Sequence, residues 1–301
     1  MNTRNRRNHI LYSLISVALF LSCLVAVHAK ESDQCWRKIT TKRHYGGPAM
    51  QQFPKGLSQP GSIVIDRTNS RLFVLDHGNG MIQILTAQFL LPVGQLRIPG
   101  GAQPTAISLW KHTLLVATSD QRLWRFDLSP QPRPMGVLNT LPGQACLMTS
   151  NKDSIVFYDC THQSLYHIHT RKPGFFRMSG LSSASRPSSL MMTSSNELFL
   201  TDRTLSVILH YRGVQSRPMI WGQPDHTNQP VTIAADQNRH FFYALSKSGI
   251  LNIYLEGKIC NRINLFRRRT LPLSGADIAV QGSRLWLSDP ALNQILLFDL
   301  E

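Results

Sequence analysis

The stretch PGSIVIDRTNSRLFVLDHGNGMIQIL, residues 60–85, contains three short apolar runs separated by two turns. It begins with a proline, and its second apolar run ends at the corner Asp-His-Gly-Asn. The runs are rich in β-branched and aromatic residues and are broken by Gly, Asn, Asp and Ser, which favours strands over helices. The stretch therefore predicts three consecutive antiparallel strands.

The same pattern recurs through the chain. Its six copies begin at prolines 38 to 45 residues apart, namely Pro60, Pro104, Pro142, Pro187, Pro230 and Pro272. The corner column is occupied in chain order by Asp76, Thr118, Asp159, Asp202, Leu245 and Asp289. An aspartate at such a corner can accept hydrogen bonds from backbone N–H groups two and three residues further on. We therefore interpret the corner aspartates as structural residues.

Each unit continues into a variable fourth stretch, so the chain contains six units of about four strands. This size and pattern predict an all-β, six-bladed β-propeller, in which blades surround a central channel. The chain ends within the third strand of the sixth unit. The segment CWRKITTKRHY, residues 35–45, is the unassigned candidate for the missing outer strand. We expect this N-terminal strand to close the ring of a single domain covering residues 30–301.

The N-terminus has the pattern of a secretory signal peptide. Arg4, Arg6 and Arg7 precede an apolar stretch over residues 10–27, and Ala29 ends a small-residue cleavage pattern. An uncleaved signal anchor is the alternative, because the stretch approaches the roughly 20 residues that a membrane helix needs. We predict a signal peptide over residues 1–29, a secreted or periplasmic protein, and no membrane span after cleavage.

The chain is strongly basic. Removal of residues 1–29 takes away three arginines and no acid, so the formal net charge falls from +15 to +12. Inside a cell such a charge would first suggest nucleic acid as the partner. Export argues against nucleic acid and favours anionic envelope lipids, anionic glycans or acidic protein surfaces.

Four cysteines remain after residue 29: Cys35, Cys146, Cys160 and Cys260. An even number in an exported chain suggests disulfides. A closing N-terminal strand would lie beside blade 5, whose outer strand carries Cys260, so we favour the pair Cys35 and Cys260. Cys146 and Cys160 then form a second pair. Simple hairpin register sets these two about three positions apart, beyond the Cα spacing of roughly 4.4 to 6.8 Å that a disulfide tolerates. Free thiols are therefore the alternative for that pair.

Three units show a resemblance to a known family. The stretches beginning at Pro60, Pro187 and Pro272 resemble NHL repeats, with an apolar inner strand, an apolar-Asp corner and a third apolar strand. The linker WGQPDHTNQP, residues 221–230, is similar to the joins between such repeats. The resemblance covers residues 60–301 and implies the propeller fold. It implies no single activity, because the family includes channel-site metalloenzymes and non-enzymatic platforms that bind protein, glycan or RNA.

Few residues could serve an enzyme of that channel-site type. The glutamates fall in hairpin turns or near the chain ends, and Asp277 is the one acid that we expect to face the channel. One carboxylate makes neither a metal cage nor an acid–base pair. His162, His167 and His169 lie close enough in sequence to suggest a transition-metal site, but a solvated strand face is the favoured interpretation. The sequence therefore predicts no catalytic residue, no metal and no cofactor.

Basic residues concentrate in the loops that join strands two and three of a blade and in the links between blades. Both kinds of loop open on the same face of the ring. The candidate binding residues on this face are Arg122, Arg186, Arg203, Arg217, Trp221, His226, Lys247, Arg267, Arg268 and Arg269. His77 and Arg97 are predicted to lie on the same face.

These patterns predict a monomeric, exported, non-catalytic binding platform for an anionic ligand or a protein partner. A channel-site lactonase or lyase, and a structural module of a surface or secretion assembly, are the alternatives.

Overall fold

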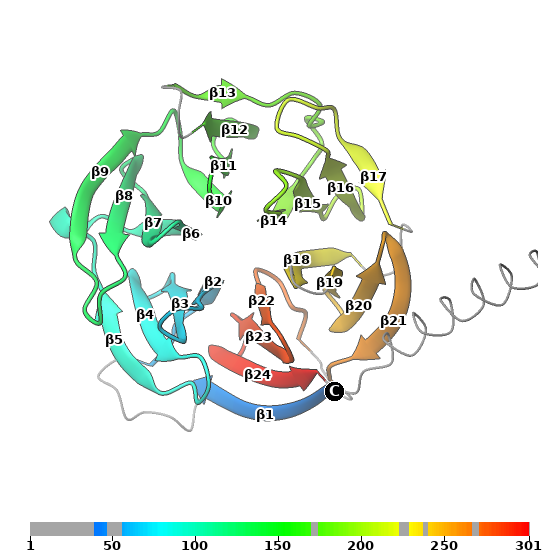
Figure 1. Ribbon diagram of the computed structural model, residues 1–301, viewed down its shortest axis with the longest axis horizontal. Coiled ribbons are helices and arrows are strands. Elements are labelled where there is room, and N and C mark those ends of the chain that lie inside the picture. The colour runs from blue at the N-terminus through cyan, green and yellow to red at the C-terminus, as the bar shows by residue number, and fades with distance from the viewer. Residues whose placement is uncertain are drawn as a thin grey trace, which may run out of the picture. The chain divides into compact units, whose positions relative to one another are not determined.

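The computed structural model describes residues 39–46, 56–169, 174–222, 229–236, 240–266 and 271–300, with side chains from residue 56 onward. These residues form six four-stranded antiparallel sheets around a central channel, so the predicted all-β six-bladed β-propeller is confirmed (Figure 1). The predicted signal peptide, residues 1–29, lies outside the described residues. No helix in the described ranges has the length and apolar character needed to cross a membrane.

The first three blades are continuous in sequence. Blade 1 contains β2 (Pro60–Asp66), β3 (Arg71–Asp76), β4 (Met81–Thr86) and β5 (Pro92–Leu96). A 3-10 turn, η1 (Pro99–Gly101), precedes blade 2, which contains β6 (Pro104–Trp110), β7 (Thr113–Thr118), β8 (Arg122–Asp127) and β9 (Pro134–Thr140). Blade 3 contains β10 (Ala145–Ser150), β11 (Ser154–Asp159), β12 (Ser164–His169) and β13 (Phe176–Arg177).

The last blade combines both ends of the described chain. Blade 4 contains β14 (Pro187–Met192), β15 (Leu198–Asp202), β16 (Val207–Tyr211) and β17 (Met219–Trp221). Blade 5 contains β18 (Pro230–Asp236), β19 (Phe241–Ser246), β20 (Ile250–Leu255) and β21 (Lys258–Asn264). Blade 6 contains β22 (Ile278–Gln281), β23 (Arg284–Asp289), β24 (Gln294–Leu300) and β1 (Ile39–Gly46).

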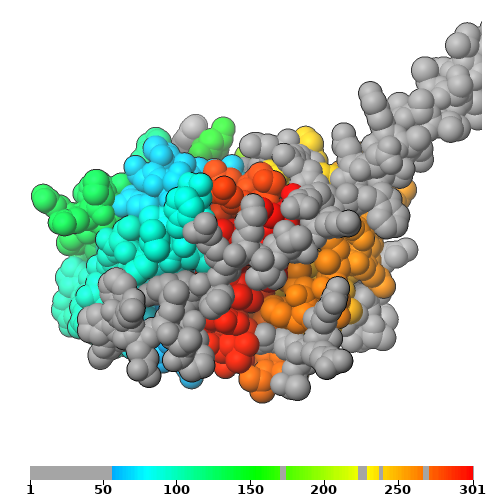
Figure 2. Space-filling view, turned by 90° about the horizontal axis from the view of Figure 1, so that it is seen from below, coloured from blue at the N-terminus to red at the C-terminus, as the bar shows by residue number. Residues whose placement is uncertain are grey.

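The hydrophobic core lies between neighbouring blades, because the two faces of each sheet are covered by the blades on either side. Clusters of buried apolar side chains lie at the junction between blades 6 and 1 and at each junction from blade 1 to blade 5. One of them joins the last blade to the first: Trp286 packs with Leu72 and donates its indole N–H to the carbonyl oxygen of Ala87 at 2.9 Å. Figure 2 shows blade 6, in red, between blade 1 in cyan and blade 5 in orange.

The alternation of strands gives the channel two distinct mouths. We call the mouth where each second strand ends and the third begins the corner mouth, and the opposite one the turn mouth.

The corner residues stabilise the turns at the corner mouth. Asp159 and Asp202 each accept hydrogen bonds from the backbone N–H groups two and three residues on, as predicted. The strand register places Ser246, and not Leu245, opposite the first residue of blade 5, so the predicted column was wrong by one residue there. Its hydroxyl accepts the N–H of Ile250 at 3.0 Å.

A β-bulge recurs near the start of the inner strand. The register between the first two strands shifts by one residue directly after the first residue of blades 2, 3, 4 and 5, and at the corresponding position of blade 1. A bulge inserts an unpaired residue and bends the strand locally. Here it turns the start of each of these inner strands at the corner mouth.

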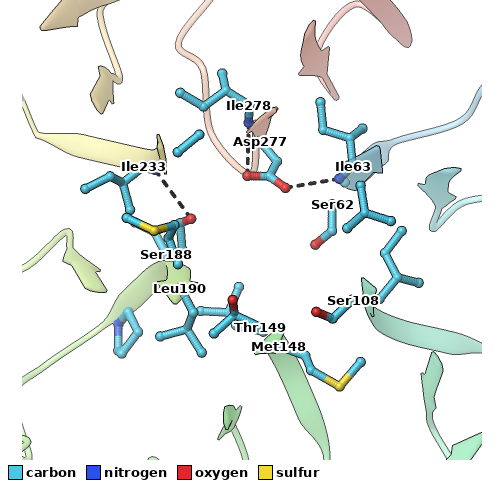
Figure 3. A pocket seen from close by; sticks show the side chains of 18 of the residues that line it. Ser62, Ile63, Ser108, Met148, Thr149, Ser188, Leu190, Ile233, Asp277 and Ile278 are labelled. Carbon is cyan, nitrogen blue, oxygen red and sulfur yellow. Dashed lines mark hydrogen bonds between the residues drawn. The ribbon is translucent and has the colours of Figure 1, made fainter. Parts of the chain in front are cut away.

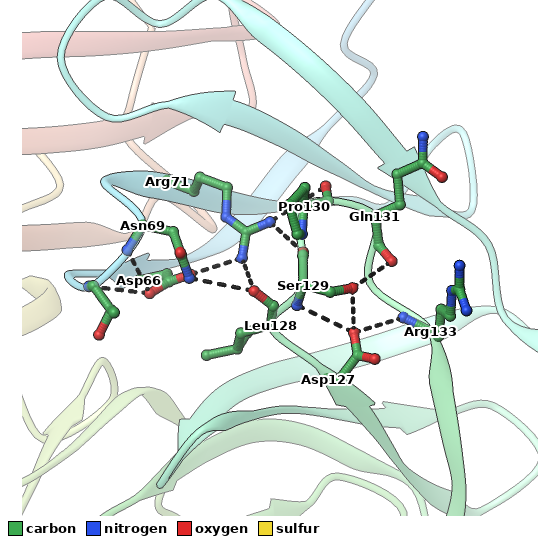
Figure 4. Close-up of polar contacts among 10 residues, drawn as sticks. Asp66, Asn69, Arg71, Asp127, Leu128, Ser129, Pro130, Gln131 and Arg133 are labelled. Carbon is green, nitrogen blue, oxygen red and sulfur yellow. Dashed lines mark hydrogen bonds and ion pairs between the residues drawn. The ribbon is translucent and has the colours of Figure 1, made fainter.

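A buried arginine fixes blade 2 against blade 1 at the turn mouth (Figure 4). Arg71 is 7% exposed and donates to the carboxylate of Asp66 at 2.8 Å. It also donates to the carbonyl oxygens of Leu128 and Ser129, both at 2.6 Å. Burial alone would raise the pKa of Asp66, but hydrogen bonds from Asn69 and Arg71 lower it below its usual value. The ion pair therefore ties the loop that follows β8 to the first blade.

The N-terminal strand β1 pairs antiparallel with β24, from Ile39 opposite Leu300 to Gly46 opposite Gln294 (Figure 1). That the ring depends on this strand stays a prediction. Deleting residues 35–45 should leave β24 as an unpaired edge, and such edges promote association between chains. We expect a lower melting temperature and oligomers in analytical ultracentrifugation. A deletion variant that stays monomeric and melts like the full chain would show that the ring does not need β1.

Candidate functional site

A cavity of about 620 Å³ runs along the channel and is lined by the inner strands of all six blades. Its size falls within the roughly 300–1,000 Å³ typical of small-molecule sites. The lining extends from corner-mouth residues such as His77 and Arg203 to Arg67 beyond the end of β2. The cavity is therefore a concave feature in which a ligand could be held.

Asp277 lies on the cavity wall opposite Met148 and Thr149 (Figure 3), and it is the only acid in the lining that the structure describes. Its carboxylate accepts hydrogen bonds from the N–H groups of Ile63 and Ile278, both at 3.0 Å, and from the hydroxyl of Thr232 at 2.7 Å. Burial raises the pKa of Asp277, although these hydrogen bonds oppose the shift.

These bonds make Asp277 a link between three blades. Ile63 belongs to blade 1 and Thr232 to blade 5, while Asp277 itself precedes β22 of blade 6. The chain of contacts continues into blade 4, since the hydroxyls of Thr232 and Ser189 are 3.3 Å apart. Both carboxylate oxygens therefore already accept hydrogen bonds, and these bonds connect neighbouring blades. The sequence prediction that Asp277 faces the channel is confirmed, and the contacts favour a structural role for it.

Two predicted binding residues meet at the corner mouth. Arg186 and Arg203 both line the cavity on the side of blade 4, together with Gln163 from blade 3. One guanidinium nitrogen of Arg186 donates to Gln163 at 3.2 Å and to the carbonyl oxygens of Ser183 and Ser185. Within the described residues, neither guanidinium has a carboxylate at ion-pair distance.

Arg203 is the more buried of the two. Its Nε atom is buried and has no hydrogen-bond partner in the part of the chain that the structure describes. Burial also lowers the pKa of Arg203, because a partly desolvated guanidinium loses hydration. An anion bound at this mouth would compensate for that loss.

Arg217 was placed on the wrong face by the sequence. It lies between the end of β16 at Tyr211 and the start of β17 at Met219, so its loop joins a third strand to a fourth and opens at the turn mouth. The variable fourth stretch of this blade has no clear bounds in the sequence, and β17 has only three residues. Arg217 therefore lies on the face opposite Arg186 and Arg203.

The other predicted binding residues that the structure describes do not line the cavity. Arg122 is exposed and lies 3.5 Å from the carboxylate of Asp120, and Lys247 is exposed in a corner loop. Trp221 packs between blades 4 and 5, with ring centroids 5.1 Å from Phe199 and 5.0 Å from Phe242. His226, Arg267, Arg268 and Arg269 lie outside the described residues.

Cys146 and Cys160 form a disulfide with Cα atoms 5.9 Å apart, and both residues line the cavity at the corner mouth. The expectation that hairpin register separates them too far was wrong. Cys146 is the bulged residue of β10, between Ala145 opposite Asp159 and Leu147 opposite Tyr158. The bulge brings Cys146 within reach of the residue that follows the strand. Cys35 lies outside the described residues, so its pairing with Cys260 stays a prediction.

The histidines of blade 3 do not form a metal site, and no group of possible metal ligands occurs among the described residues. His162 contacts the buried carboxylate of Asp159 at 2.6 Å, as Asn79 contacts Asp76 at 2.8 Å three residues after its own corner. His167 is buried, 3.0 Å from the hydroxyl of Ser154, and burial together with nearby His169 lowers the pKa of His167 to about 4. The expected solvated strand face was therefore wrong for His167.

The sequence analysis missed the uncharged members of the corner mouth. Gln163 and Tyr158 line the cavity beside the arginines, and Leu147 and Leu190 form the wall on the same side. Selecting loop residues by charge alone could not find them. The repeat alignment could have found Leu147 and Leu190, because they occupy inner strands.

Comparison with known proteins supports the fold. No protein-family model and no curated protein sequence matches the chain, so membership of the NHL family stays a prediction. Among solved structures, a protein of unknown function from Bacteroides thetaiotaomicron matches with a TM-score of 0.64 and 11% identity, over 88% of this chain and 76% of that one. Virginiamycin B lyase from Staphylococcus aureus matches with a TM-score of 0.60 and 11% identity, over 88% of this chain and 100% of that one. At this level of identity the likeness shows a shared six-bladed β-propeller fold and no activity.

Proposed function

We propose that the protein is a non-catalytic binding platform that holds an anionic ligand at the corner mouth through Arg186 and Arg203. The observation that carries the proposal is that both guanidiniums line one cavity without a carboxylate partner among the described residues. A partly buried cation is costly unless an opposite charge accompanies it. An anion at this mouth would supply that charge.

The predicted signal peptide favours a ligand outside the cytoplasm, such as an anionic glycan, an anionic lipid or an acidic protein surface. The contacts of Asp277 favour binding over catalysis, since its carboxylate already accepts three hydrogen bonds from the fold. We therefore place the protein in the secreted or periplasmic compartment, without an activity of its own.

The double variant Arg186→Ser/Arg203→Ser tests the proposal. We expect it to elute from immobilised heparin at lower salt than the wild type, because it lacks two of the cations that bind the polyanion. Less salt is then needed to release it, since salt screens exposed charges within roughly 8 Å at physiological ionic strength. The matched control is Arg133→Ser/Arg217→Ser, which removes two exposed arginines from turn-mouth loops. Its elution should stay closer to that of the wild type. Equal shifts for both double variants would show that retention reflects net charge alone.

A further inference from the structure

Two of the arginines described at the corner mouth lie at the cavity itself. Of the predicted basic residues that the structure describes, Arg186 and Arg203 line the cavity, whereas Arg122 and Lys247 are exposed outside it and Arg217 lies at the opposite mouth. Two guanidinium groups at one cavity suit a compact anionic group placed at the entrance of the channel.

The cavity wall on the side of these arginines includes apolar side chains. Leu147 and Leu190 are partly exposed in the cavity lining and pack against the buried cluster between blades 3 and 4. Met191 belongs to the same wall. Ser188 and Thr149 lie beside these apolar residues in the lining, and Asp277 and Ser62 lie in blades 6 and 1 (Figure 3). The cavity therefore has a cationic entrance on blade 4, and Leu147 and Leu190 add apolar surface to its wall on blades 3 and 4.

From this arrangement we infer that the ligand is a small organic anion with an apolar body. Its carboxylate or phosphate group lies between Arg186 and Arg203, and its apolar body lies against Leu147 and Leu190 inside the channel. This inference rests on the proposed function and narrows it to one ligand class. Arg203 lines the cavity, so its guanidinium is placed to donate to the anionic group. Charge-assisted hydrogen bonds to a guanidinium are the strong ones for such groups. The apolar wall adds affinity for the rest of the ligand.

Isothermal titration with the full chain tests the inference, using acetate, hexanoate and octanoate below their micelle-forming concentrations. We expect binding to tighten with chain length, by up to about fourfold for each methylene that is fully buried. Octyl phosphate, compared with octanoate, whose alkyl chain is of similar length, identifies the preferred anionic group. Acetate and octanoate binding equally well would overturn the inference. Heparin retention that still depends on Arg186 and Arg203 would then leave the proposed function standing.

Two variants locate the apolar body. Leu190→Asn should weaken octanoate binding several-fold and leave heparin retention unchanged, since it alters the wall and not the arginines. Leu205→Asn is the matched control, because Leu205 is 41% exposed in a corner loop of the same blade and does not line the cavity. Ala235→Phe, which fills the lining from blade 5, should also weaken octanoate binding if Leu190→Asn fails to fold. Unchanged octanoate binding in a folded wall variant would overturn the inference.

Discussion

Replacing Arg71 by methionine should destabilise the propeller by about 3 kcal/mol, because breaking a buried ion pair leaves its remaining partner uncompensated. The lost contacts are the pair with Asp66 and the hydrogen bonds to the carbonyl oxygens of Leu128 and Ser129. The guanidinium carbon also lies 5.4 Å from the ring centroid of Phe73. For a domain of this size, we expect the melting temperature to fall by roughly 6–12 °C. Differential scanning calorimetry measures both quantities.

Arg97→Met is the control, because it removes the same charge from an exposed link between blades. Surface substitutions of this kind usually change stability by no more than about 0.5 kcal/mol. The acid sensitivity of the two proteins gives a second measurement. Since the pKa of Asp66 is lowered in the folded state, its contribution to stability is present above about 3.8 and is lost as the pH falls below that value. Wild type and Arg71→Met melting at the same temperature would show that the interblade contacts contribute nothing.

The sequence predicted the fold because each blade repeats a pattern that backbone geometry requires. Pro60, Pro104, Pro187 and Pro230 each begin an inner strand, a position where proline is tolerated because no ladder hydrogen bond from its nitrogen is needed. Asp159 and Asp202 close their second strands by local hydrogen bonds, which short-range sequence can specify, whereas Asp76 accepts the backbone N–H of Ser58 from 18 residues earlier. Apolar runs of five or six residues then locate the successive strands of each blade.

The site was harder to predict because it depends on register and on contacts between blades. The bulge that allows the disulfide at Cys146 leaves no mark in the residue types around it. Arg217 was misplaced because an irregular fourth strand hides where the preceding loop ends. Trp221 is of a residue type common in binding sites, yet it packs between Phe199 of its own blade and Phe242 of the next blade, a contact that the residue type does not show. Such tertiary contacts override what a residue type suggests.

The second large effect concerns Asp277, whose carboxylate faces the channel but accepts its hydrogen bonds from the fold. Asp277→Ala removes the acceptor of three donors, namely the Ile63 and Ile278 N–H groups and the Thr232 hydroxyl. An unsatisfied buried donor costs about 1–3 kcal/mol, and partial access from the channel reduces this cost. We therefore expect Asp277→Ala to lose about 3 kcal/mol of stability in urea unfolding. Ser62→Ala, a cavity-lining change in the neighbouring blade, is the control and should have little effect.

The variant Asp277→Asn separates the charge of this residue from its hydrogen bonds. Because the pKa of Asp277 is raised above 3.8 in the folded state, the folded chain retains this proton at a pH where the unfolded chain releases it. The stability of the wild type relative to Asp277→Asn should therefore be greatest below about pH 3.8 and should decrease as the pH rises through the raised pKa. Urea unfolding of both proteins across this range measures the difference. A difference that grows with pH would mean that the ionised carboxylate is the stabilised form, and that the donors of blades 1, 5 and 6 outweigh its burial.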